Sequence, residues 1–147
     1  MPPIPFSYET TGVVIVDHGS RREESNLRLL DLVELFRKKQ SYKIVEPAHM
    51  ELAEPSIEQA FAACIDQGAE SIVVSPFFLL PGRHWQDDIP QLSAAASKAH
   101  NSIPFMVSSP LGIHDKLVEV LSDRISFCLN SADSDLCSNC STTKKCR

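Results

Sequence analysis

The sequence predicts an α/β fold in which an open parallel sheet of four strands, in the order 2-1-3-4, is flanked by helices. Short runs of β-branched residues alternate with longer segments that carry apolar residues at helical spacing, which is the pattern of successive βα units. The first run, residues 12–17, is apolar until its end, as expected for a strand buried on both faces of a parallel sheet. With 147 residues, of which 43% are apolar, the chain is long enough to form one domain with its own core.

Each predicted strand is followed by a helix, which gives four βα units. The strands are expected at residues 12–17, 43–46, 71–74 and 103–107. The helices are expected from the turn at residues 19–20 to about residue 40, at 56–67, from 86 or 89 to 100, and at 113–127. Ser20 is the expected N-cap of the first helix, and Gly68 is expected to end the second. The inward face of the first helix is expected to be apolar and to contain Leu27, Leu30, Val33 and Leu35.

We expect three parts along the chain: an N-terminal extension at residues 1–11, the α/β domain at 12–128 and a C-terminal tail at 129–147. The tail is rich in Asn, Ser, Asp, Thr and Lys and has no apolar periodicity, so it cannot form a core of its own. It also carries three of the five cysteines of the chain.

Composition argues against two classes of partner. The chain has 14 Lys and Arg against 19 Asp and Glu, a net charge of −5, whereas a surface that binds a nucleic-acid backbone shows clustered Lys and Arg. The longest dense apolar stretch, residues 72–80, is shorter than the roughly 18 residues of a membrane span and is broken by Ser75 and Pro76. The first residues lack the basic and apolar regions of a secretory signal. We therefore expect no nucleic-acid partner and no membrane partner.

Unusual polar residues follow three of the predicted strands. His18 comes directly after the first strand, Glu51 follows the second and His84 follows the third. Ligands of an open parallel sheet bind beyond the carboxyl ends of the strands, and right-handed crossovers in the order 2-1-3-4 make the first and third strands neighbours. The three loops should therefore meet at one rim. Two imidazoles and a carboxylate suit a divalent metal such as Fe, Co, Ni or Zn.

Each of these residues also has an ordinary structural interpretation. His18 can be a loop or helix-capping histidine, and His84 an exposed loop histidine. Glu51 can be a solvated carboxylate, with Glu54 as a competitor for its role. His49 lies two residues from Glu51 and would share its face in an extended segment, so its involvement stays open.

Three segments give the chain a specific resemblance. They are VIVDHGSR at residues 14–21, MELAEPSI at 50–57 and SPFFLLPGRHWQDDIP at 75–90. Over about residues 12–127 the chain resembles the class II tetrapyrrole chelatases, the sirohydrochlorin cobaltochelatase and ferrochelatase family. The resemblance implies a chelatase or flavodoxin-like fold, with His18 and His84 as the active-site histidines and Glu51 as the carboxylate that completes the metal cluster. It also implies a supporting role for Asp88 and the pairing of two subunits.

The activity that the resemblance implies is insertion of Fe²⁺ into sirohydrochlorin to form sirohaem, with release of two protons. In this mechanism His18 and His84 hand over the metal, one of them accepts a pyrrole proton, and Glu51 assists the transfer. The alternatives are a cobaltochelatase of the same family, a metal carrier without catalysis, and a flavodoxin-like binding module whose turn at residues 19–20 holds a phosphate or flavin.

The substrate of such an enzyme is flat, largely apolar and edged with eight carboxylates. Arg21, Arg22 and Arg83 are placed in the sequence to meet carboxylates, and Trp85 is expected to contact the macrocycle. The loop at residues 77–80 is apolar enough to line the same site. Ordinary core packing is the alternative for that loop, above all for its first and third residues.

The cysteines divide into two groups. Cys64 lies among apolar residues of the second predicted helix and is expected to be a buried small hydrophobe. Cys137, Cys140 and Cys146 form a C-x-x-C pair with a third thiol, which fits metal or iron–sulfur ligation, a redox disulfide or incidental thiols. The tail resembles that of plant members of the family, which implies an iron–sulfur cluster, expected to be [2Fe–2S], a homodimer and a location in the chloroplast stroma, with the transit peptide absent from this chain. Cys128 or a residue of the second subunit would supply the fourth ligand.

Overall fold

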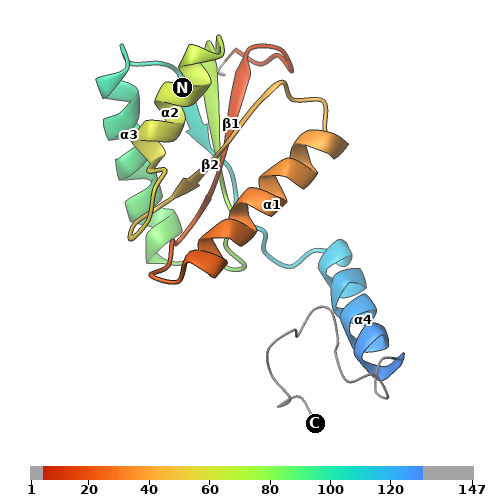
Figure 1. Ribbon diagram of the computed structural model, residues 1–147. Coiled ribbons are helices and arrows are strands. Elements are labelled where there is room, and N and C mark those ends of the chain that lie inside the picture. The colour runs from red at the N-terminus through yellow and green to blue at the C-terminus, as the bar shows by residue number, and fades with distance from the viewer. Residues whose placement is uncertain (1–4, 131–147) are drawn as a thin grey trace. The chain divides into compact units, whose positions relative to one another are not determined.

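The structure, a computed structural model, describes residues 5–130 and contains the predicted parallel sheet (Figure 1). The strands are β1 (Thr11–Asp17), β2 (Ile44–His49), β3 (Ser71–Pro76) and β4 (Phe105–Val107). The helices are α1 (Glu23–Lys39), α2 (Ile57–Asp66), a π-helical turn η1 (His84–Asp88), α3 (Ile89–Ala99) and α4 (Asp115–Asn130). All strand pairs are parallel and the order is β2-β1-β3-β4, which confirms the predicted topology.

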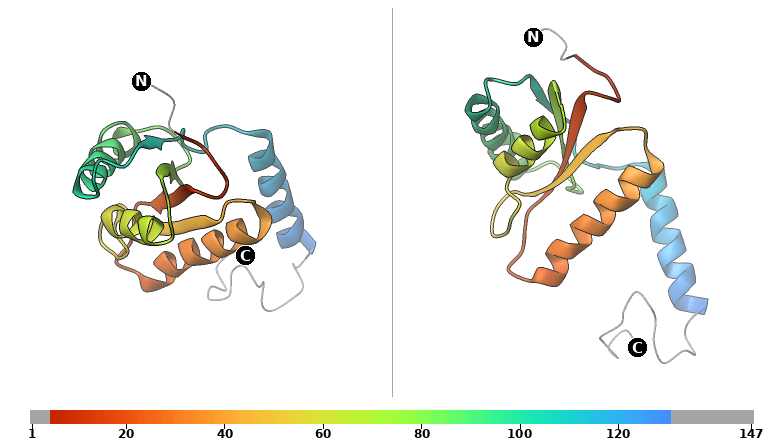
Figure 2. Two further views of the ribbon diagram at one scale, coloured as in Figure 1. Left: turned by 90° about the horizontal axis from the view of Figure 1, so that it is seen from above. Right: turned by 45° about the horizontal axis from the view of Figure 1, so that its top comes forward.

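Helices pack on both faces of the sheet, as Figures 1 and 2 show. Alternate residues of β1 pack on opposite faces of the sheet. Val14 and Val16 lie in the layer of α2 and α3, whereas Val13 and Ile15 lie in the layer of α1. Side chains from α2 and α3 complete the first layer, among them Ala60, Phe61, Cys64, Ile89 and Ala96. A strand covered on both faces is apolar throughout, which explains the sequence of β1.

Helix α1 faces the sheet with different residues from those expected. Its buried residues are Leu29 and Val33, with Leu32 and Phe36 packed against them. Of the residues expected inside, only Val33 is buried, and Leu27, Leu30 and Leu35 are exposed. Leucines occur all around this helix, so the apolar spacing admits more than one inward face.

The turn into α1 also differs from the prediction. The N-cap is Arg22, which makes no side-chain capping bond, and not Ser20. The hydroxyl of Ser20 instead accepts a hydrogen bond from the backbone N–H of Arg22, at 3.0 Å. The side chain of Asn26 closes the turn by bonding both the N–H and the carbonyl of Ser20. Ser20 thus shapes the loop that follows β1 rather than the first helical turn.

Strand β2 extends to His49, three residues beyond its expected end, because residues 44–49 pair in register with residues 12–17 of β1. Helix α2 then begins with a capping box in which Ser56 and Gln59 each bond the backbone of the other. Gly68 follows the end of this helix with φ of +96°, as predicted.

The chain divides into two units between Gly112 and Ile113, and α4 belongs to the second. The expected single domain at residues 12–128 spans both units, and its boundaries stay a prediction. Within residues 5–130, no helix is both long and apolar enough to cross a membrane.

Candidate active site

The loops after β1, β2 and β3 meet at the carboxyl edge of the sheet, as predicted. The N–H of Phe77, at the end of β3, donates to the carbonyl of Val16 at 2.7 Å. On the other side, the N–H of Met50 donates to the carbonyl of Asp17 at 2.9 Å, and the N–H of Glu51 to that of His18 at 3.1 Å. These backbone bonds fix the His18 loop between its two neighbours.

His18 and His84 lie side by side at this rim. Their ring centroids are 4.8 Å apart and their planes are nearly perpendicular, at 81°. The ring of His18 also stacks on Phe78, with centroids 4.1 Å apart and planes 14° apart. Phe78 is 6% exposed and belongs to the core, so the exposed imidazole rests on a fixed apolar surface. The two histidines that the sequence singled out are therefore brought together.

A carboxylate orients His84. Its Nδ1 atom lies 2.7 Å from Oδ2 of Asp88, four residues later in the π-helical turn. Because a carboxylate only accepts, Nδ1 donates and Nε2 keeps its lone pair free for a metal or a proton. Within residues 5–130, Nε2 of His84 and both ring nitrogens of His18 have no hydrogen-bond partner. The single π-helical turn at this point is a feature often found at functional sites.

Glu51 reaches the rim through its backbone, but its side chain is exposed. An open cavity of about 390 Å³ lies next to it and is lined by Met50, Glu51, Asp88, Gln91 and Leu92. In the part of the chain that the structure describes, no three His, Cys, Asp or Glu side chains are close enough to hold one metal ion. The paired histidines are thus assembled, whereas Glu51 would have to turn from the cavity to join them.

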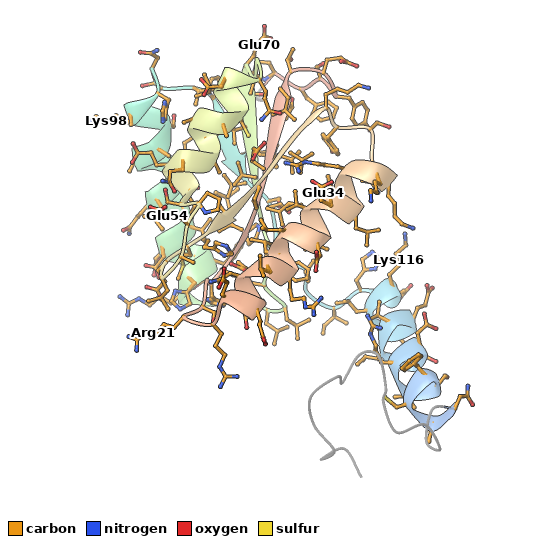
Figure 3. All side chains as sticks on the ribbon, in the orientation of Figure 1. Arg21, Glu34, Glu54, Glu70, Lys98 and Lys116 are labelled. Atoms are coloured by element: carbon orange, nitrogen blue, oxygen red, sulfur yellow. The ribbon has the colours of Figure 1, made fainter. Side chains whose placement is uncertain are left out.

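The three arginines expected to contact substrate surround this rim. Arg21 and Arg22 lie in the turn after β1, and Arg83 directly precedes His84. All three are exposed, and none forms an ion pair within residues 5–130. Figure 3 shows the side chain of Arg21 at the end of the sheet where β1 finishes, opposite to Glu70, which precedes β3. Unpaired guanidinium groups are available for carboxylates of a ligand.

The apolar loop after β3 presents exposed side chains next to the histidines. Phe77, Leu79 and Leu80 are 46%, 57% and 55% exposed, so core packing is the wrong interpretation for Phe77 and Leu79. The core residue of this loop is Phe78, which is buried in the cluster formed by α2, α3 and the sheet. Backbone bonds from Leu111 to Phe78 and from Gly112 to Leu79 hold the loop in place.

Trp85 occupies an intermediate position. Its ring packs partly against the core, and its Nε1–H donates to the carbonyl of Ser108 at 3.0 Å. The indole is therefore fixed at the edge of the histidine pair, with part of its surface accessible. Contact between Trp85 and a ligand stays a prediction.

The cysteines that the structure describes differ in accessibility. Cys64 is fully buried, as expected, and burial raises the pKa of its thiol to about 12, with a smaller contribution from Glu46. Cys128 is exposed on α4. The predicted cluster ligands Cys137, Cys140 and Cys146 lie outside the described residues.

Comparison with known sequences identifies the family. The sequence model of the CbiX family matches residues 12–127. The chain belongs to the CbiX family. This CbiX chain is 54% identical over 141 residues to a protein of Arabidopsis thaliana named sirohydrochlorin ferrochelatase, chloroplastic, and the match covers 95% of this chain and 63% of that protein. It is 31% identical to the sirohydrochlorin cobaltochelatase of Methanocaldococcus jannaschii, over 76% of this chain and 95% of that protein.

A solved structure agrees with this assignment. The sirohydrochlorin chelatase SirB of Bacillus subtilis subspecies spizizenii, in complex with cobalt, superposes with a TM-score of 0.74 at 32% identity. The superposition covers 80% of this CbiX chain and 50% of the SirB chain. The chain therefore spans less than two thirds of the plant relative and half of this bacterial one.

The sequence left two features of the site unspecified. A supporting role was expected for Asp88, but its bond to His84 was not, although residues four apart lie on the same side of a helix. The stacking of His18 on Phe78 had no signal, since it depends on how two loops from different strands meet.

Proposed function

We propose that this CbiX chain is a chelatase that inserts Fe²⁺ into sirohydrochlorin to form sirohaem. The observation that carries the proposal is the contact of His18 with His84, since Phe78 supports one ring and Asp88 orients the other. Membership of the CbiX family and the ferrochelatase name of the plant relative support the choice of reaction.

The chemistry requires a metal ion to lose its waters and the macrocycle to lose two protons. Two pyrrole N–H bonds break, bonds from the ring nitrogens to Fe²⁺ form, and the two protons leave with bases or water. His84 presents a free Nε2 because Asp88 holds its other nitrogen. In the proposed mechanism the two imidazoles deliver the metal, one of them accepts a proton, and Glu51 turns from the adjacent cavity to offset positive charge.

Substrate binding uses the surfaces around the histidine pair. The exposed side chains of Phe77, Leu79 and Leu80 offer an apolar surface to the flat macrocycle. Arg21 follows β1 and Arg83 directly precedes η1, and both are exposed and available for its carboxylates. The local cations matter more for this polycarboxylate than the net charge of −5.

Cobalt insertion is the second candidate. The archaeal relative is named a cobaltochelatase, and the SirB structure contains cobalt. Imidazole nitrogens suit both Fe²⁺ and Co²⁺ and bind Co²⁺ somewhat more tightly, so the donor set does not select iron. Selection would then depend on which metal is available.

The direct test is an anaerobic assay with purified protein, sirohydrochlorin and either Fe²⁺ or Co²⁺, followed by the absorbance change of metal insertion. We expect acceleration over the uncatalysed reaction with Fe²⁺ and loss of that acceleration in His18→Ala. Faster insertion of Co²⁺ than of Fe²⁺ at equal concentrations would favour the cobaltochelatase. Metal binding without acceleration would show a carrier, and binding of flavin without metal insertion would show a flavodoxin-like module.

We also propose that the tail binds an iron–sulfur cluster, expected to be [2Fe–2S], through Cys137, Cys140 and Cys146. The support is the C-x-x-C spacing with a third thiol, together with the accessibility of Cys128 as a fourth ligand. Such a group supplies electron-transfer or structural capacity when bound. Anaerobically purified protein should absorb in the visible range, and the Cys137→Ser/Cys140→Ser double variant should not.

Finally, we propose that the protein acts as a homodimer in the chloroplast stroma. The superposition covers half of the SirB chain, so two copies would match its length, and the plant relative is named chloroplastic. Light scattering coupled to gel filtration should give a mass near twice 16.3 kDa. Plastid fractionation checks the location.

A further inference from the structure

One buried ionisable side chain at the rim has no part in the mechanism above. His49, the last residue of β2, is only 1% exposed. It lies in register with Asp17 of β1, and its Nδ1 atom is 2.6 Å from Oδ1 of that carboxylate. A buried imidazole is uncommon unless it has a partner, and this partner directly precedes His18 in the chain.

Asp17 connects His49 to the turn that carries His18. The same Oδ1 atom accepts the backbone N–H of Gly19 at 2.9 Å, so one carboxylate oxygen receives two hydrogen bonds. Since the carboxylate only accepts, Nδ1 of His49 is the donor. The side chain of Asp17 is 23% exposed, so its orientation depends on these two donors more than on solvent.

The turn is also closely packed against the strand that carries His49. Gly19 has φ of +83°, and a Cβ atom placed on it would lie 1.8 Å from the carbonyl oxygen of Glu51 and 3.2 Å from Cβ of His49. The carbonyls of Asp17 and His18 accept the N–H groups of Met50 and Glu51. A change in the orientation of the Asp17 carboxylate would therefore shift the backbone of both His18 and Glu51.

We infer that His49 is a positioning residue for His18, acting through Asp17. Its Nδ1–H holds the Asp17 carboxylate, Asp17 holds the N–H of Gly19, and the resulting turn sets the imidazole of His18 against Phe78 and His84. The pair of His49 and Asp17 resembles the pair of His84 and Asp88, but it differs in two ways. His49 is buried, and the metal-handling residue is His18, the chain neighbour of Asp17, instead of the paired histidine itself. This inference rests on the proposed function, because it concerns how the metal-handling histidine is held.

Three substitutions at one position separate this role from simple core filling. The amide nitrogen of an asparagine occupies the place of Nδ1 and can donate to Asp17, whereas that of a glutamine occupies the place of Nε2. His49→Asn should therefore keep the bond, His49→Gln should lose it, and His49→Phe should keep the volume without any donor. His100→Phe is the matched control, because Nε2 of His100 is buried without a partner within residues 5–130 and this residue follows α3, away from the rim.

The first readout is steady-state kinetics of Fe²⁺ insertion, with folding checked by circular dichroism. We expect His49→Gln and His49→Phe to lower kcat by about tenfold, at the lower end of the loss that follows removal of a direct partner of a metal ligand, because His49 acts on His18 only through Asp17. KM for sirohydrochlorin should change little. His49→Asn should recover most of the wild-type kcat, and His100→Phe should leave kcat unchanged. Equal kcat in His49→Gln and wild type, or a folded His49→Asn as impaired as His49→Gln, would overturn the inference. If His49→Phe does not fold, the Asn and Gln variants decide.

The second readout needs neither metal nor substrate. In uniformly ¹⁵N-labelled wild-type protein, His49 should be the Nδ1–H tautomer, and the Gly19 amide should exchange slowly with solvent. His49→Gln should speed exchange at Gly19, and His49→Asn should not. If wild-type protein fails to insert metal while these signals are present, the proposed function fails and the positioning of the turn stands. If insertion occurs but Gly19 exchanges equally in all variants, the inference fails and the function stands.

Discussion

Nδ1 of His84 and Oδ2 of Asp88 are 2.7 Å apart in the π-helical turn that opens the third helical segment. The carboxylate is 34% exposed and the imidazole 45% exposed, so the pair lies at the surface of the rim and not within the core. Asp88 therefore fixes the tautomer and direction of His84 and leaves Nε2 directed away from it.

Removing this carboxylate should weaken metal handling without unfolding the chain. We expect Asp88→Asn to lower the rate of Fe²⁺ insertion and the affinity for Co²⁺ by about tenfold to a hundredfold. The neutral amide is a weaker acceptor for Nδ1–H of His84 than the carboxylate, and because it can also donate, it no longer fixes the tautomer of the imidazole. The neighbouring carboxylate Asp87 is exposed and has no hydrogen bond to His84, so Asp87→Asn is the matched control. Equal losses in the two variants would show a general effect of negative charge at the rim.

The stacking of His18 on Phe78 predicts a second effect. Phe78→Leu keeps an apolar residue in the core but removes the flat surface beneath the imidazole. We therefore expect a clear loss of kcat for insertion together with only a small loss in the free energy of unfolding. Phe61, which is fully buried beneath the sheet away from the histidines, gives the control. Phe61→Leu should lower the free energy of unfolding by about 1 kcal/mol and leave kcat close to wild type. Activity loss in proportion to stability in both variants would remove the role assigned to Phe78.

Gly19 allows a sharp test of the packing of the rim. An added Cβ would lie 1.8 Å from the carbonyl oxygen of Glu51, and φ is +83°, so Gly19→Ala must separate the His18 and Glu51 segments. We expect loss of insertion activity and a lower melting temperature. Gly68 has φ of +96° but nothing within 4 Å of the added atom, so Gly68→Ala should cost only about 1 kcal/mol of stability and no activity. Wild-type activity in Gly19→Ala would contradict the described turn.

Cys64 makes stability sensitive to alkali. Burial raises the pKa of its thiol from 9.0 to about 12, so the folded chain keeps a proton that the unfolded chain releases. The contribution to stability is complete below about pH 9 and is lost as the pH rises toward 12, by up to about 1.4 kcal/mol per pH unit.

Denaturant unfolding at several pH values from 8 to about 10.5 measures this slope. Cys64→Ala should remove that part of the alkaline loss, and Cys64 should resist alkylation in the folded protein at pH 8 while the exposed Cys128 reacts. A slope unchanged by Cys64→Ala would contradict the buried thiol.

The parts of the fold that the sequence predicted are those with a strong local pattern. The all-apolar strand at residues 12–17, the turn glycine Gly68 and the order of βα units follow from periodicity and chain connectivity. The inward face of α1 was wrong because leucine occurs on several sides of that helix. Only the sheet decides that Leu29 and Val33 are buried while Leu27 and Leu35 are exposed.

The candidate site shows the same limit. His18 and His84 could be paired in advance, because residues that follow neighbouring parallel strands meet at one edge. The support from Phe78 and the bond between His49 and Asp17 could not, since both depend on contacts between loops whose spacing carries no period. The position of the Glu51 side chain beside the adjoining cavity could not be predicted either, for the same reason.

In the proposed mechanism His18 and His84 together hold the metal that is inserted. A crystal structure of the protein with Co²⁺ and without tetrapyrrole would show the metal ligands themselves. We predict Co²⁺ within about 2.2 Å of Nε2 of His84 and of one ring nitrogen of His18, with Asp88 still bonded to Nδ1 of His84. Metal bound at Glu51 and Asp88 in the adjacent cavity, with both imidazoles free, would show that the two histidines do not hold it.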